Sequence, residues 1–224
     1  MRIQTPPAVS DDQLAKWMQV TQDRIRKGKL DGPTFQHILG HPALAGQLDK
    51  VFSGMAAEYR RSLPLIERPP FLTVRVGTLK TEPELRQAVL DSGCKIGNWA
   101  IDLMNQPAFK SGIAQVEEDI DFVIASNEEL GYPNGCTRIQ SYEAGLKLGW
   151  KKCLISDGPE IRRNYLDQPD GEYLLVASDP VADSDGYLKV FYVGHVLDRL
   201  WLLSCSGSPG YFWYGLYRWV FRRK

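Results

Sequence analysis

The residues whose types and spacing best suit chemistry lie in one short segment, DGPEIRR, at positions 157–163. It combines two carboxylates with two guanidinium groups. Its Gly-Pro pair favours the start of a helix, where free backbone N–H groups and the helix dipole attract an anion. Its arginines could add charge-assisted hydrogen bonds to a phosphate or a carboxylate. The segment, called the hook below, therefore predicts an anion-binding site made of Asp157, Glu160, Arg162 and Arg163.

A purely structural interpretation of the hook stays open beside the first. Asp157 can cap the turn, and Glu160 suits the first turn of a helix. Arg162 and Arg163 can pair with neighbouring carboxylates instead of a ligand. The hook is thus either a ligand site or a local scaffold.

A second candidate is the aromatic C-terminal stretch, in which arginines follow closely on aromatic residues. Its aromatic residues are Tyr211, Phe212, Trp213, Tyr214, Tyr217 and Trp219. Alternate side chains of a strand point to opposite faces, so Phe212 and Tyr214 point away from the other four. We expect one set to pack on a sheet and the other to stay partly exposed beside Arg218 and Arg222, as an interface for a protein partner or a second copy. Base stacking and simple coverage of the sheet are the alternatives.

The remaining polar constellations indicate structure more than chemistry. The segment Asp183–Gly186 echoes part of a calcium loop, but Val181 and Tyr192 would fill its first and twelfth positions and cannot ligate, so we predict a hairpin turn. The histidines His37, His41 and His195 lack a paired metal-binding spacing, and no phosphate-binding or nucleophile-elbow motif occurs. Residues 82–104 partly match a helix–turn–helix unit, but without a basic recognition face we predict two core-packing helices there. We predict no cofactor and no metal.

Length and composition limit the class of protein. The chain has 224 residues, 43% of them apolar and 24% charged, typical of a globular protein. Positive and negative residues balance at 27 each, which lowers the expectation of nucleic-acid binding. No apolar run approaches the roughly 18 residues that span a bilayer, and no signal peptide is indicated, so we expect a cytoplasmic protein. Its four cysteines have no C-x-x-C spacing and are expected to be free and buried.

The order of local signals predicts an α+β fold: an N-terminal helical segment, then an α/β unit with a mainly antiparallel C-terminal sheet. Residues 1–63 show helical periodicity, and the proline-rich segment 64–70 is the expected linker to an α+β domain over 71–224. Thr81 with Glu84, and Thr137 with Gln140, form capping boxes. In the helix after Thr137, we expect Ile139, Tyr142 and Leu146 to line one face, which packs inward. The expected strands cover residues 71–76, 120–124, 153–155, 172–177, 187–193, 200–205 and 216–221.

The run ELGYPNGCTRIQSYEAGLKLGW, together with GPEIRRNYLDQPDGEYLLVASDP and the segments that flank it, resembles a family of uncharacterised bacterial proteins. The resemblance covers roughly residues 71–224 and implies one coherent C-terminal unit. It implies no activity and no catalytic residue. The best hypothesis is a non-enzymatic binding or regulatory module that acts through protein contacts. An enzyme or phosphate-ligand binder built on the hook, and a nucleic-acid binder using the basic and aromatic surface, are the alternatives.

Overall fold

A computed structural model describes residues 63–223. Leu63 begins a compact unit that runs to the C-terminus. The predicted helices of residues 1–63, with His37 and His41, lie outside the described residues apart from Leu63. The division into segments 1–63, 64–70 and 71–224 therefore stays a prediction.

The described helices are short and precede or interrupt the strands. They are the 3-10 turn η1 (Leu65–Glu67) and the α-helices α4 (Glu82–Asp91), α5 (Asn98–Asn105), α6 (Pro107–Ser111), α7 (Arg138–Lys147) and α8 (Asp157–Asn164). The strands are β1 (Leu72–Val76), β2 (Lys95–Ile96), β3 (Glu118–Ser126), β4 (Cys136–Thr137), β5 (Tyr173–Val176), β6 (Val181–Ala182), β7 (Leu188–Val196), β8 (Arg199–Ser206), β9 (Phe212–Trp213) and β10 (Arg218–Arg223). None of the described helices is long and apolar enough to cross a membrane.

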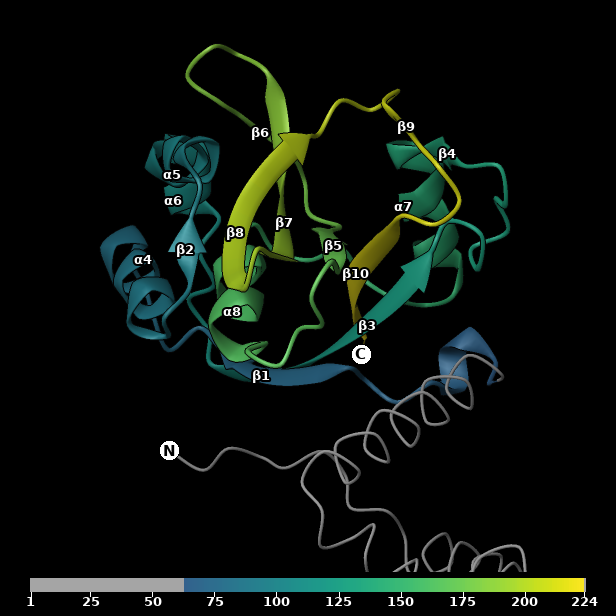
Figure 1. The fold of residues 1–224 in the computed structure, drawn as a ribbon, viewed down its shortest axis with the longest axis horizontal. Helices are drawn as coiled ribbons and strands as arrows, with labels where there is room; N and C mark the ends of the chain where they lie inside the picture. Colours follow the sequence, from purple (N-terminus) through teal and green to yellow (C-terminus); the bar gives the residue numbers. More distant parts are fainter. Residues whose placement is uncertain (1–62, 224) are drawn as a thin grey trace, which may run out of the picture. The chain divides into compact units, whose positions relative to one another are not determined.

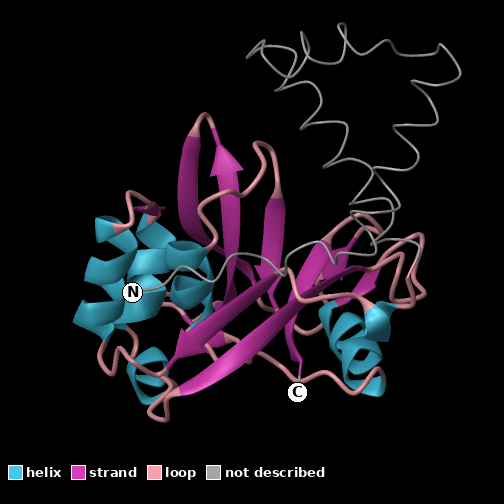
Figure 2. Ribbon diagram, turned by 90° about the horizontal axis from the view of Figure 1, so that it is seen from below, coloured by secondary structure: helices cyan, strands magenta, loops and turns pink. Residues whose placement is uncertain are grey.

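Eight strands form one curled sheet in the order β1–β3–β10–β5–β7–β8–β2, with β6 paired to β7 outside this path (Figures 1 and 2). Most neighbours are antiparallel, but β10 runs parallel to β5 and β8 parallel to β2. Strands β4 and β9 form a separate two-stranded ladder. The predicted α+β class is confirmed, and the sheet is mixed because of the two parallel pairs.

Each face of the sheet packs against its own helices, as the alternation of side chains along a strand requires. Helices α4, α5, α6 and α8 cover one face, while α7 lies on the other (Figure 1). The first core includes Leu103, Phe109 and Phe191; the second is built around Trp219 and Phe221. Strand β10 lies between β3 and β5 and is buried on both faces, which explains its continuous apolar run.

Both predicted capping boxes are present, at Thr81–Glu84 on α4 and Thr137–Gln140 on α7. The predicted inner face of α7 is wrong in part. Of its three expected members, Tyr142 is buried, but Ile139 and Leu146 are exposed. Gly145 faces inward instead. A side chain at this position would collide with the ring of Phe221, so the close packing needs a glycine there.

Residues 82–104 form two helices that pack into the core, as predicted. Strand β2 separates α4 from α5 and pairs with β8, so the segment is part of the main sheet. Residues 64–70 also differ from a plain linker, because Leu65–Glu67 forms one 3-10 turn and the Arg68 guanidinium lies 2.6 Å from the Glu129 carboxylate.

Candidate functional site

The hook makes up all of α8 except its last residue, Asn164, and most of it is buried. Asp157 lies at the first position of the helix, and its carboxylate accepts two hydrogen bonds from Arg222, each 2.6 Å long. It also accepts the backbone N–H of Leu154 at 2.8 Å. Burial raises the pKa of Asp157, although Arg222 opposes the rise. Asp157 therefore holds α8 to β10 and does not face solvent.

The other hook residues are also occupied within the protein. Glu160 is buried and pairs with Arg163 at 2.7 Å. Arg162 is fully buried and donates to the side chain of Gln168 and the backbone oxygen of Tyr165. Burial lowers the pKa of the Arg162 guanidinium. This geometry favours the structural interpretation of the hook over the open anion site.

The expected position of Arg222 beside Phe212 and Tyr214 is wrong. Its side chain is only 9% exposed and pairs with Asp157, and the half-exposed Glu118 is a second partner at 3.1 Å. Arg222 and Arg218 stand at opposite ends of β10, so one strand carries both a buried charge and a half-exposed charge. The alternation of side chains along the strand places Arg218 and Arg222 on the same face, but the structure buries Arg222 more deeply.

Residues 211–217, called the aromatic loop below, form the most exposed apolar segment of the described chain. The exposed fractions are 48% for Tyr211, 50% for Phe212, 69% for Tyr214, 82% for Leu216 and 41% for Tyr217. The predicted exposure of Phe212 and Tyr214 agrees with these values. Tyr211 and Tyr217 are exposed as well, because the chain forms β9, turns, and only then enters β10.

Two buried tryptophans anchor the aromatic loop. Trp213 and Trp219 pack edge to face, with ring centroids 5.6 Å apart, and both belong to the core under α7. The rings of Tyr211 and Tyr217 lie 4.9 and 5.0 Å from Trp213. The exposed rings are thus carried on a buried aromatic stack.

Asn127 fixes the backbone of the loop, and sequence reasoning missed it. This fully buried amide donates to the backbone oxygens of Trp213 and Tyr214, both at 3.0 Å. Its oxygen accepts from the Ser141 hydroxyl at 2.7 Å and from the Trp219 indole at 3.1 Å. These four bonds join Asn127 to the aromatic loop, α7 and β10. In the sequence Asn127 is one polar residue in a polar connection, so only the fold reveals its role.

Two glycines allow the neighbouring backbone to approach the loop closely. A Cβ on Gly215 would lie 2.1 Å from the backbone oxygen of Pro133, and one on Gly135 would lie 2.4 Å from that of Trp213. Residues 133–135 therefore lie directly against the loop backbone, while the loop side chains at 212, 214 and 216 are exposed.

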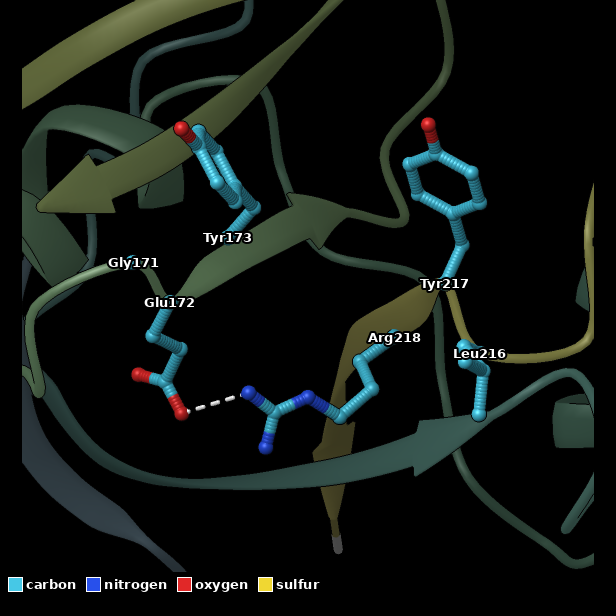
Figure 3. Close-up of a pocket in the computed structure, with 6 residues that line it drawn as sticks. All are labelled: Gly171, Glu172, Tyr173, Leu216, Tyr217 and Arg218. Atoms are coloured by element: carbon cyan, nitrogen blue, oxygen red, sulfur yellow. Dashed lines mark hydrogen bonds and ion pairs between the residues drawn. The ribbon is translucent and has the colours of Figure 1, made fainter. Parts of the chain in front are cut away.

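A hollow of about 300 Å³ opens beside the loop, at the end of the sheet where the parallel strands β5 and β10 begin (Figure 3). It is lined by Gly171, Glu172, Tyr173, Leu216, Tyr217 and Arg218. At its floor Arg218 donates to Glu172 over 2.7 Å. The Tyr173 ring lies 6.2 Å from that of Tyr192, so aromatic surface continues onto β7. The predicted interface residue Arg218 belongs to this hollow.

The other candidates have structural partners. Asp183 is buried and accepts the backbone N–H groups of Asp185 and Tyr187, which agrees with the predicted hairpin turn. His195 contacts the backbone oxygen of Gln168 through Nδ1 at 2.7 Å. All four cysteines are free; three are buried and Cys205 is half-buried. Within residues 63–223, no group of three or more potential ligands is arranged to hold a metal.

No family model, curated protein or solved structure matches the chain.

Proposed function

We propose that the protein is a binding module that recognises an extended segment of another protein through its aromatic loop. The observation that carries this proposal is the combination of exposure and rigidity at residues 211–217. When exposed aromatic groups lie on a flexible loop, ordering of that loop reduces the free energy gained on binding. Here Asn127 and the tryptophan stack already hold the loop backbone.

The composition of the surface supports a protein partner. Tyrosine, phenylalanine and leucine dominate the loop, and aromatic residues are enriched at the centres of protein interfaces. Arg218 is the one cation within the hollow, and it already pairs with Glu172. Nucleic acid needs more positive charge than this to neutralise its phosphates, so the nucleic-acid alternative has less support.

The anion-binding alternative also has less support. Asp157, Glu160 and Arg162 are all buried, so a ligand at the hook would have to displace their internal partners. Removing one partner from a buried ion pair is strongly unfavourable. The aromatic loop requires no such rearrangement.

A selected-peptide experiment tests the proposal. Random peptides are displayed and selected on the full chain, and the affinities of the enriched peptides are measured. We expect the double variant Phe212→Ser, Tyr214→Ser to weaken them by roughly thirtyfold, because each truncation at an interface centre removes about 1 kcal/mol. The melting temperature should change little, since both side chains are at least half exposed.

The matched control is Leu90→Ser with Val116→Ser, which removes two exposed apolar side chains away from the loop. It should leave the affinities unchanged. If no peptide is enriched, or if the two double variants behave alike, the proposed function is wrong.

A further inference from the structure

The two partners of the Glu172–Arg218 ion pair differ in how much hydrogen-bonding capacity they have left. Glu172 uses both carboxylate oxygens, one for Arg218 and one for the Tyr165 hydroxyl at 2.9 Å. Arg218 uses only Nη2, and no acceptor within residues 63–223 binds its Nε or Nη1. The Arg218 side chain is 39% exposed and that of Glu172 only 9%. The hollow therefore offers spare donors to an incoming group.

The residues of the hollow divide between two sides. Leu216 and Arg218 are two positions apart, and in Figure 3 both point to the same side as Glu172. The rings of Tyr173 and Tyr217 project to the other side. An apolar group that covers Leu216 would thus lie next to a group that binds Arg218.

We propose that this hollow binds a carboxylate that has an apolar side chain next to it. The inference rests on the proposed function, because such a group would belong to the protein segment that covers the aromatic loop. A planar carboxylate matches the fork of a guanidinium and can accept two of its hydrogen bonds. The apolar neighbour covers Leu216, which is otherwise the most exposed side chain of the loop.

The surrounding charges favour a carboxylate over a phosphate. Glu172 lies 2.7 Å from the guanidinium, and the exposed Asp170 stands two positions before it in the chain. A dianionic phosphate would meet more repulsion from these carboxylates than a singly charged group. The carboxylate can come from a chain terminus or from an acidic side chain, and both carry the same chemistry.

Two matched pairs of probes separate these sources. N-acetylphenylalanine and its amide differ only in a terminal carboxylate. N-acetyl-Phe-Glu-amide and N-acetyl-Phe-Gln-amide differ only in a side-chain carboxylate. Each is titrated into the full chain while NMR follows the Arg218 Nε–H and the Leu216 and Tyr217 amides. We expect the acid of at least one pair to bind about fivefold tighter than its neutral counterpart. The pair that discriminates identifies the source.

Three variants make the result specific to Arg218. Arg218→Gln should abolish the discrimination, and Glu172→Gln should increase it several-fold, because it frees Arg218 from its internal carboxylate. Arg75→Gln should change nothing, since Arg75 is another half-exposed arginine that pairs with a glutamate, Glu117. Should Arg218→Gln fold poorly, Glu172→Gln still decides the question.

The proposal is overturned if acids and neutral probes bind alike, or if Glu172→Gln leaves their ratio unchanged. That failure is distinct from failure of the proposed function, which is judged by the Phe212 and Tyr214 variants. The affinity of selected peptides could depend on Phe212 and Tyr214 even if Arg218 does not discriminate acids from neutral probes. Equally, Arg218 could discriminate them even if the peptides do not depend on Phe212 and Tyr214.

Discussion

Replacement of Asp157 by Asn is the sharpest test of the scaffold that supports the site. The substitution keeps the shape of the side chain and its contact with the Leu154 N–H, but removes the negative charge. Arg222 would then be buried with only the half-exposed Glu118 as a counter-charge. Removal of one partner from a buried pair is worth about 3–5 kcal/mol, so we expect a loss of unfolding free energy in that range.

A double-mutant cycle separates the pair from its surroundings. Arg222→Met alone should also destabilise the protein, but the double variant should lose about 1–3 kcal/mol less than the sum of the two single variants. Arg75→Met is the matched control. It breaks an exposed ion pair with Glu117, so it should change the unfolding free energy by at most about 1 kcal/mol.

Urea unfolding of the full chain, followed by tryptophan fluorescence, measures these free energies. A Trp17→Phe background leaves only the five tryptophans of the described unit as reporters. If Asp157→Asn and Arg75→Met cost the same, or if the cycle is additive, the buried pair does not join α8 to β10 as argued.

The pH dependence supplies an independent check. The folded-state pKa of Asp157 lies above its ordinary value because of burial, and loss of Arg222 removes the main opposing cause. An acid with a raised folded pKa contributes stability that is present at low pH and lost as pH rises through that pKa. Relative to wild type at each pH, the penalty of Arg222→Met should therefore shrink on going from about pH 7.5 to about pH 5. The penalty of Asp157→Asn should not shrink in this way.

Two further predictions concern the packing around the site. Gly145→Ala should destabilise the protein by about 1–3 kcal/mol in urea unfolding, because the new Cβ would lie 2.5 Å from the Phe221 ring; an unchanged value would contradict the close contact. Burial raises the pKa of Glu129, but the Ser126 N–H and Arg68 outweigh it, so the folded pKa is lowered. Its contribution is therefore present above the ordinary pKa of 4.5 and lost as pH falls through the folded value. Glu129→Gln should thus cost stability at pH 7 and little at about pH 3, and a constant penalty would refute this sign.

Local features of the fold could be predicted because neighbours in the chain determine them. Thr81 with Glu84 and Thr137 with Gln140 satisfy helix N–H groups within one turn, so the capping boxes are legible in the sequence. The strand of residues 71–76 shows its alternation directly. The curled sheet could not be predicted, because the parallel pairing of β10 with β5 depends on contacts between distant segments.

The error at Arg222 has the same origin. Sequence reasoning treated the last strand as having one face on the sheet and one in solvent. In the structure β10 is a central strand with neighbours on both edges and packing on both faces. An arginine buried in such a strand needs a carboxylate as a counter-charge, and Asp157 of helix α8 provides it. No pattern within either segment indicates that the hook and the last strand meet.

The position of β10 also explains how one strand can serve two roles. Its last residues are fixed to α8 through the Asp157–Arg222 pair, while its first residue, Arg218, opens into the hollow beside the aromatic loop. Trp219 lies between them, packs on Trp213 and is fully buried. Substitutions near residue 222 should therefore change stability, whereas those at 212 and 214 should change binding. The two properties can be separated by experiment because they lie at different depths of one continuous segment.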